Sequence, residues 1–386
     1  MGTSSQQHTA PRSHAPRGNA YGAKESVVGK TGLDPHGDRG NQQWGRIPPR
    51  SHAPRGNAYG VKGCVVAKID RDSHGDRGNQ NRIKPGDIKS MQEKLTTLED
   101  AIALVNDGDV VALQNMATQA APMTLVRELI RQNKKELGLV VLVGGLPVDW
   151  LAAAGVINRL IGAAVTMEQF GLCQQYRQAV EQQRVRVEEI SESVLNARLG
   201  AGARNLPFLP TRGAIGTDLM KENPENMKLL EDPFGGLPVI ACRALVPDVA
   251  LIHAHRADRF GNIQYEPTAI WPDIGIMPKA AKRVIVSAEE IVDTEVLRRN
   301  PDRTVLPGFI VDAVVEIPYG AHPTSFFPNY GYDSQFHREW TAVSRDDEKV
   351  SAFIEKYIRA PASQTEYLDL IGGDARLKHI EKWEEA

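Results

Sequence analysis

The sequence is poor in several features that define whole classes of protein. Only three cysteines occur in 386 residues, at positions 64, 173 and 242, and no two of them form a CxxC pair. A disulfide framework and a cysteine zinc site are therefore excluded, and we expect buried free thiols. Apolar runs of about 18 residues are absent, and so is the apolar segment of a secretory signal, which predicts a soluble, cytoplasmic protein with no membrane partner.

The first 90 residues lack the apolar side chains that a folded domain needs. They contain one leucine, no phenylalanine and 14 glycines. They carry 15 Lys+Arg against 7 Asp+Glu, a net charge of +8, which leaves 31 basic and 41 acidic residues, a net of −10, in residues 91–386. So little apolar surface cannot offset the entropy lost when a chain becomes ordered. We therefore expect a disordered basic extension over residues 1–90 and one domain over residues 91–386.

The extension also contains a duplication. Residues 12–22 recur letter for letter at residues 50–60, an offset of 38. Folded repeats keep an apolar core pattern from copy to copy, and here there is almost none to keep. The segment also lacks the interleaved aromatic residues that stack on bases, so we expect no nucleic-acid partner. The simplest hypothesis is a start codon placed too far upstream, with Met91 as the natural beginning.

Beyond Met91, apolar runs alternate with segments of helical periodicity. Continuous apolar runs between amphipathic helices are typical of a largely parallel sheet covered by helices on both faces, so we predict an α/β fold. The predicted strands are residues 110–113, 139–143, 160–165, 185–190, 283–287 and 309–315. The predicted helices begin near Thr96 and at Pro122, and cover residues 150–154, 174–183 and 193–204.

The most informative segment covers residues 248–265. An apolar run from Val249 to Ile252 leads into His253, His255 and Asp258. The chain then turns at Gly261–Asn262 and resumes with apolar residues, a pattern that predicts a strand, a tight turn and a short returning strand. Ligands of parallel sheets bind outside the carboxyl ends of the strands, so Gly261 and Asn262 are candidate substrate-binding residues.

This segment resembles the middle of the alpha subunits of family I CoA-transferases, the group that includes glutaconate CoA-transferase. Similar motifs follow in the same order along the chain, and the resemblance covers about residues 93–360. The matching segments are residues 106–113, 205–212, 216–218, 280–290, 318–324 and 329–332.

The resemblance implies acyl transfer through a carboxylate nucleophile. A glutamate attacks an acyl-CoA thioester, a mixed anhydride forms, and the resulting glutamyl-CoA thioester passes CoA to a second acid. In two-chain members that glutamate lies in the beta subunit, within a Ser-Glu-Asn-Gly type motif that is absent here. The resemblance therefore implies a heterodimer or heterotetramer with a beta subunit. It also implies an acyl-CoA and a small organic acid as substrates, and no bound cofactor.

One departure from the family pattern concerns the loop after the first strand. The alpha-subunit pattern has Gly-Gly-Phe there, and this chain has Gln114, Asn115 and Met116. Glycines let backbone N–H groups approach an anion closely, so the side-chain amides of Gln114 and Asn115 are candidate donors in their place. Arg212 is a candidate for pairing with a substrate carboxylate, with a surface salt bridge as the alternative.

Two alternative functions remain open. A related branch of the family opens steroid-ring CoA thioesters by adding water, and its working glutamate lies near the position of Glu192. The alternative interpretation of Glu192 is a carboxylate in the first turn of a helix. Glu188 and Glu189 are expected to be solvated charges at a strand end. The other alternative is a non-catalytic ligand-binding or scaffold protein on the same fold.

The pair of histidines at positions 253 and 255 raises the question of a metal site. Residues two apart on a strand project to the same side and can chelate one ion. Further ligands would have to come from His322 or His337, in loops rich in proline and glycine. We expect no metal, and we expect His322 to line a pocket or to form a hydrogen bond within a loop.

Overall fold

A computed structural model describes residues 92–267 and 272–382. The extension predicted for residues 1–90, and Cys64 within it, lie outside these ranges. Cys173 and Cys242 are buried free thiols, which confirms the prediction for these two. Among the described residues, no helix is both long and apolar enough to cross a membrane.

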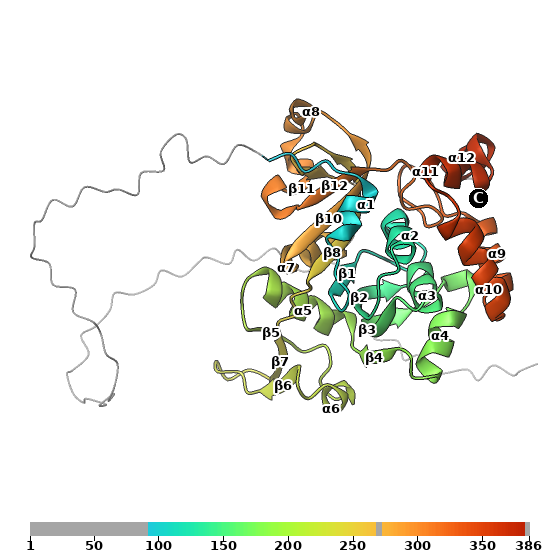
Figure 1. Ribbon diagram of the computed structural model, residues 1–386. Coiled ribbons are helices and arrows are strands. Elements are labelled where there is room, and N and C mark those ends of the chain that lie inside the picture. Colours follow the sequence, from blue (N-terminus) through green and yellow to red (C-terminus); the bar gives the residue numbers. More distant parts are fainter. Residues whose placement is uncertain (1–91, 268–271, 383–386) are drawn as a thin grey trace, which may run out of the picture. The chain divides into compact units, whose positions relative to one another are not determined.

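A sheet of seven parallel strands forms the centre of the described part (Figure 1). Their spatial order is β12-β10-β8-β1-β2-β3-β4. The strands are β1 (Val110–Leu113), β2 (Leu137–Gly144), β3 (Ile157–Val165), β4 (Arg186–Glu189), β8 (Val249–Ala257), β10 (Arg283–Ile291) and β12 (Ala313–Glu316). Two short antiparallel strands, β9 (Ile263–Gln264) and β11 (Thr304–Leu306), extend the sheet beside the end of β8. The predicted parallel sheet and the turn after β8 are therefore confirmed.

Helices cover both faces of this sheet, as predicted. One face packs against α1 (Leu98–Ala103), α2 (Met123–Arg131), α3 (Leu146–Ala153), α4 (Gln174–Glu181), α9 (Ser334–Val343) and α10 (Asp347–Ile354). The other face packs against α5 (Glu192–Ala203) and α7 (Pro272–Ala280), and α12 (Gly373–Glu381) packs on the loop that follows β12. Alternate residues of one strand enter different cores: Val111 and Leu113 of β1 enter the first, and Ala112 enters the second. Successive side chains of a strand point to opposite faces of the sheet, so a strand covered by helices on both faces is apolar at every position.

Short helical segments complete the described part. They are α6 (Leu219–Glu222), α8 (Thr294–Arg298), α11 (Gln364–Leu370), the 3-10 turns Glu168–Phe170, Pro301–Arg303 and Gly308–Ile310, and a π-helical turn over Glu355–Arg359. Most predicted boundaries change by a few residues, and the helix predicted over residues 150–154 begins earlier, at Leu146. The helix predicted to open at Thr96 is capped by Thr97, whose hydroxyl accepts from the Asp100 backbone N–H. The strand predicted over residues 309–315 begins only at Ala313 because a 3-10 turn occupies its first part.

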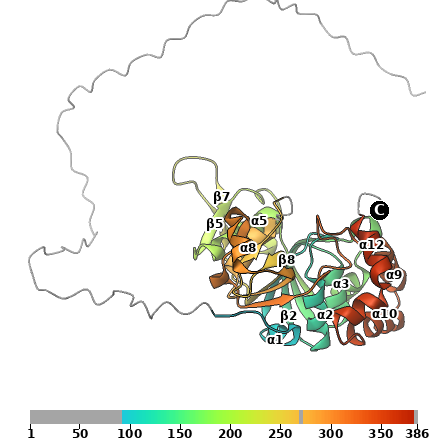
Figure 2. The same ribbon diagram turned by 90° about the horizontal axis from the view of Figure 1, so that it is seen from above.

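A second, small sheet was not predicted. Three antiparallel strands form it in the order β5-β7-β6, namely β5 (Phe208–Thr211), β6 (Met227–Leu230) and β7 (Val239–Arg243). Ile240 and Cys242 of β7 join the core that α5 shares with the large sheet. Figures 1 and 2 both show β5 and β7 beside α5, away from helices α9, α10 and α12.

Candidate functional site

The loops that follow the parallel strands meet at the carboxyl edge of the large sheet. Gln114 and Asn115 follow β1, Gly145 follows β2, and Glu192 follows β4. His253 lies on β8 directly beside Ser287 of β10. This is the edge at which parallel sheets bind ligands. The structure thus brings most of the predicted residues to one edge, although they occupy different parts of it.

The Gln114 side chain is buried and has a fixed orientation. Its Oε1 accepts a hydrogen bond of 2.7 Å from the His253 backbone N–H. A backbone N–H can only donate, so this bond determines which end of the amide is oxygen. The Gln114 Nε2 atom has no hydrogen-bond partner among the described residues. Leaving a buried donor unpaired costs about 1–3 kcal/mol, which makes Gln114 a candidate for contact with an oxygen that the chain itself does not supply.

Asn115 has a different role within the same loop. Its Nδ2 donates to the carbonyl oxygens of Ala117 (3.0 Å) and Gln119 (3.3 Å), which closes the loop onto itself. Ala117 and Ala120 adopt φ angles of 52° and 56°, in the left-handed region that favours glycine. Outliers of this kind cost about 1–3 kcal/mol each and are concentrated at functional sites. The loop that departs from the family pattern therefore has a strained backbone held by the Asn115 side chain.

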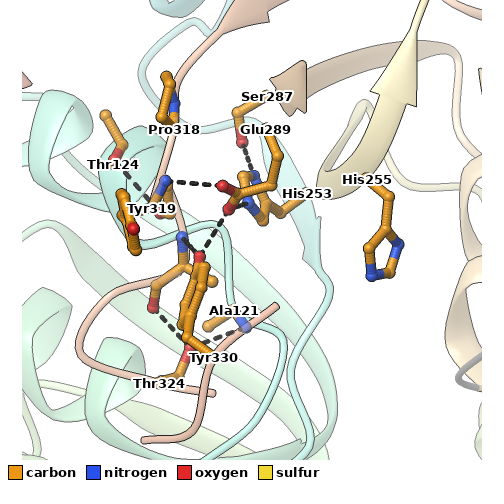
Figure 3. Close-up of polar contacts among 12 residues, drawn as sticks. Ala121, Thr124, His253, His255, Ser287, Glu289, Pro318, Tyr319, Thr324 and Tyr330 are labelled. Carbon is orange, nitrogen blue, oxygen red and sulfur yellow. Dashed lines mark hydrogen bonds and ion pairs between the residues drawn. The ribbon is translucent and has the colours of Figure 1, made fainter. Parts of the chain in front are cut away.

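A largely buried carboxylate, Glu289 on β10, lies in the part of this edge formed by β12, β10 and β8 (Figure 3). It accepts hydrogen bonds from His253 Nε2 (2.6 Å), the Tyr330 hydroxyl (2.6 Å) and the Tyr319 backbone N–H (2.8 Å). Its side chain is only 10% exposed. Burial alone would raise the pKa of the Glu289 carboxyl, but the hydrogen bonds from His253 and Tyr330 outweigh it and hold the pKa below its usual value. One ionised group thus joins β8, β10 and the loop that follows β12.

The sequence did not identify Glu289 as a site residue, although a signal was present. Ser287 and Glu289 are two apart on a strand and therefore share a face, as do His253 and His255. The register of β8 with β10 places His253 opposite Ser287. The His253 Nδ1 atom lies 2.8 Å from the Ser287 Oγ atom, so Ser287, His253 and Glu289 form a continuous hydrogen-bonded chain. Ser287 is completely buried, so this chain positions His253 and does not supply a nucleophile.

His255 contacts the segment of Phe326 and Phe327 and is not part of the Glu289 network. Its Nε2 donates to the Phe327 carbonyl oxygen at 2.8 Å, and its ring stacks on Phe326 at 4.2 Å. Burial lowers the pKa of His255 to about 4, so the ring is neutral at pH 7. Figure 3 shows His255 directed away from Glu289. Within the described ranges, no three histidine, cysteine, aspartate or glutamate side chains are grouped as a metal ion would require.

His322 forms hydrogen bonds within the C-terminal part, as expected of a loop histidine. Its Nδ1 lies 2.8 Å from the Tyr367 hydroxyl, and its Nε2 lies 3.0 Å from Asp333 Oδ2. The Arg376 guanidinium also binds both oxygens of Asp333. These contacts attach α11 and α12 to the loop that contains Tyr319 and Tyr330. These hydrogen bonds and the ion pair therefore hold that loop in position.

Glu192 and Arg212 lie close together at the other end of the edge, and both are exposed. Glu192 is the first residue of α5, and the hydroxyl of Ser191 caps this helix. Gly213 approaches Ser193 so closely that a Cβ atom at position 213 would lie 1.9 Å from the Ser193 Oγ atom. Three strand spacings, about 14 Å, separate β4 from β1. Glu192 and Arg212 are therefore too far from Gln114 to contact the same group of a ligand.

Gly261 and Asn262 form the turn between β8 and β9. Gly261 has a φ of +84°, which the turn requires. Asn262 Nδ2 donates to Asp258 Oδ2 at 2.8 Å, and Asn262 Oδ1 accepts from the Gly308 backbone N–H at 2.9 Å. Both polar atoms of this side chain therefore have partners within the fold.

The prediction that Glu188 is a solvated charge was wrong. Its carboxylate forms ion pairs with Arg159 and Arg198 and accepts a hydrogen bond of 2.8 Å from Asn226. Burial alone would raise the pKa of Glu188, but Arg198 and Arg159 outweigh it and lower the pKa. Glu189 is exposed, as expected. It also lines an open hollow of about 360 Å³ between β3, β4 and α4.

Comparison with known proteins identifies the family. A sequence model described as "Coenzyme A transferase" matches residues 95–317. The chain is 37% identical to the A-type subunit of the 3-oxoadipate CoA-transferase of Pseudomonas knackmussii, over 72% of this chain and 97% of that protein. It is 31% identical to the cholesterol ring-cleaving hydrolase IpdA subunit of Mycobacterium tuberculosis, over 69% of this chain and 94% of that protein.

The fold agrees with these matches. The crystal structure of glutaconate coenzyme A-transferase from Acidaminococcus fermentans superposes with a TM-score of 0.69 at 31% identity, and covers 74% of this chain and 95% of that one. The parallel sheet, the order of the motifs and the sequence matches all agree with the resemblance found in the sequence. The chain therefore belongs to the Coenzyme A transferase family, and within it to the alpha, or A-type, subunits.

Proposed function

We propose that this chain is the alpha subunit of a heteromeric CoA-transferase that moves CoA between an acyl-CoA thioester and a small organic acid. The observation that carries the proposal is the match along 97% of a protein named as the A-type subunit of a CoA-transferase. An alpha subunit needs a beta subunit to complete the enzyme. The nucleophilic glutamate belongs to that partner, and this chain contributes binding and positioning groups at its carboxyl edge.

Gln114 is the group that we assign to the reacting centre. In acyl transfer a carboxylate adds to the thioester carbonyl carbon, and negative charge develops on the carbonyl oxygen before the C–S bond breaks. A donor placed in advance stabilises that charge, because it needs no reorganisation during the reaction. The unpaired Nε2 of Gln114 is such a donor, held in place by the His253 backbone. Because the side chain is only 1% exposed, the loop has to shift when the partner and substrate bind, so that the donor is already in place before the reaction begins.

The assay is CoA transfer by the complex of this chain with the beta subunit from the same host. Gln114→Met should lower kcat by about 100- to 1,000-fold, the usual effect of removing one such donor. Thr118→Val is the matched control, because it removes a hydrogen bond of the same loop, to Glu168 at 2.8 Å, and leaves the donor in place. Equal effects of the two variants would contradict the assigned role of Gln114.

A hydrolase of the ring-opening type is the second candidate, and the position of Glu192 favours it. An exposed carboxylate at the start of a helix, beside the segment of Arg212, is accessible to a substrate and to water. The similarity to the cholesterol ring-cleaving hydrolase adds to this interpretation. In a hydrolase, Glu192→Gln should reduce acyl-CoA turnover by several orders of magnitude, and turnover should need no acceptor acid. In a transferase, turnover should require the acceptor and should survive this substitution.

A further inference from the structure

Exposed apolar side chains are concentrated on one part of the molecule. Among the described residues, fourteen large apolar side chains are exposed, and eight of them lie between residues 206 and 246. This span contains the small sheet and the loops around it. The eight residues are Leu206, Phe208, Ile215, Leu229, Leu230, Phe234, Leu237 and Val246. Exposed apolar side chains that gather on one part of a protein are typical of interaction sites, whereas single exposed residues need no explanation.

The pairing of the small sheet shows which residues share its outer face. Residues directly opposite each other in an antiparallel pair lie on the same face. Ile240 and Cys242 are fully buried, so the residues opposite them lie on the inner face, although Leu229 on the edge strand β6 is still 55% exposed there. The remaining strand residues form the outer face, namely Phe208, Pro210, Lys228, Leu230, Val239, Ala241 and Arg243. This face combines an apolar centre with two basic residues and carries no carboxylate.

The loop between β6 and β7 extends the apolar surface. Phe234 at its tip is 95% exposed, and Leu237 is 62% exposed. Aromatic side chains at this level of exposure are typical of the anchors of protein interfaces, where they enter a pocket of the partner. The outer face and this loop together are called the docking surface below.

The segments that flank the strands of the docking surface contact the carboxyl edge of the large sheet. Asn223, just before β6, donates from Nδ2 to the Glu189 carbonyl oxygen at 2.9 Å. Asn226 donates to the Glu188 carboxylate. The turn after β5 packs on Ser193, beside Glu192. A protein that covers the docking surface therefore lies next to the edge at which the candidate site residues are found.

We propose that the docking surface binds the beta subunit of the enzyme. This inference rests on the proposed function, which requires a partner whose nucleophile reaches the carboxyl edge of this chain. The surface offers an apolar centre for a stable contact, surrounded by charges of both signs, with Lys228 and Arg243 on the outer face and Glu231 and Asp232 in the loop. A second copy of this chain fits the requirement less well, because it would bring no nucleophile to the edge.

Substitution at two matched phenylalanines tests the proposal. Phe234 is 95% exposed within the docking surface, and Phe309 is 86% exposed in the 3-10 turn before β12. The full chain would be co-expressed with the beta subunit from the same host, and the affinity of the complex measured for each variant. Phe234→Ser should weaken the complex at least tenfold, and Phe309→Ser should leave it unchanged. The thermal midpoints of the isolated chains would show whether either substitution disturbs the fold.

Hydrogen exchange of the complex provides a second measurement. Amides of residues 206–246 should exchange more slowly in the complex than in the isolated chain. Two results would contradict the proposed role of the docking surface and leave the proposed function intact. One is a stable, active complex in which the amides of residues 206–246 exchange as fast as in the isolated chain. The other is a complex whose affinity falls more with Phe309→Ser than with Phe234→Ser. Protection of residues 206–246 in the chain alone, through self-association, would also contradict that role. If the beta subunit forms no complex with this chain, both the docking surface and the proposed function are wrong.

Discussion

Replacing Glu289 tests how the carboxyl edge is held together. Glu289→Leu removes the acceptor of three buried donors: His253 Nε2, the Tyr330 hydroxyl and the Tyr319 backbone N–H. Breaking a buried charge network by removing one member costs about 3–5 kcal/mol of the free energy of unfolding. Glu289→Gln should cost less, about 1–2 kcal/mol, because the network can rearrange around an amide.

The rearrangement follows from what each group can do. The Tyr319 backbone N–H can only donate, so it must face the oxygen of the new amide. The amide NH2 group then faces His253 and Tyr330. His253 can accept there if its proton moves to Nδ1 and is donated to the Ser287 hydroxyl at 2.8 Å. Ser287→Ala in the Glu289→Gln background removes that option, so the two substitutions together should cost more than the sum of each alone.

Urea unfolding, followed by tryptophan fluorescence, measures these effects. The pKa of Glu289 in the folded chain lies below its usual value of 4.5, so its contribution to stability is present above that pH. The contribution is lost as the pH falls through the folded pKa. The difference in stability between the natural chain and Glu289→Gln should therefore shrink from pH 7 to pH 3.5. A constant difference, or equal losses for the Gln and Leu variants, would refute the network as described.

Three further outcomes are expected. A chain shortened to begin at Met91 should assemble with the beta subunit and transfer CoA as fast as the full chain does, because the first hydrogen bond of the described fold comes from Lys94. A tenfold loss of activity would contradict this. Arg376→Met should lower the free energy of unfolding by about 3–5 kcal/mol, since it leaves buried Asp333 without its cation, and the exposed Arg298→Met should change it by less than about 1 kcal/mol. Burial raises the pKa of Asp149 to about 6, so the contribution of this carboxyl to the free energy of unfolding of the natural chain should fall as the pH rises from 4 to 7. Asp149→Asn cannot ionise, so its free energy of unfolding, measured in urea, should rise by about 3 kcal/mol relative to that of the natural chain over this range. A difference that does not change with pH would contradict the raised pKa.

The large sheet was predictable because its strands are continuous apolar runs. Residues buried on both faces of a sheet, such as those of β2 and β8, leave little ambiguity in the sequence. The small sheet was missed for the opposite reason. Its strands are four or five residues long and half exposed, and Pro210 interrupts the first of them. Short strands with one open face carry too weak a pattern to be separated from loops.

The place of the candidate residues in the fold was predictable, but their contacts were not. The rule for parallel sheets led to the loop after β1 and to the histidines of β8, both of which lie at the carboxyl edge. Glu289 was missed because its partners come from segments that are far apart in the sequence. His253 is 36 residues before it and Tyr330 is 41 residues after it. Glu188 was misjudged because its cations, Arg159 and Arg198, approach only once β3 and α5 are packed.

The two buried carboxylates divide the carboxyl edge into two separately supported parts. Glu289 connects β8 and β10 to the loop after β12, and through the His253 backbone it determines how the Gln114 amide is held. Glu188 connects β4 to α5 and to the segment before β6, and so supports Glu192 and the docking surface. Between them lie the ends of β2 and β3, followed by Gly145 and by Glu168, whose carboxylate accepts a hydrogen bond from the Thr118 hydroxyl. A partner that docks on the Glu188 side would therefore have to extend across β3 and β2 before its nucleophile reaches Gln114.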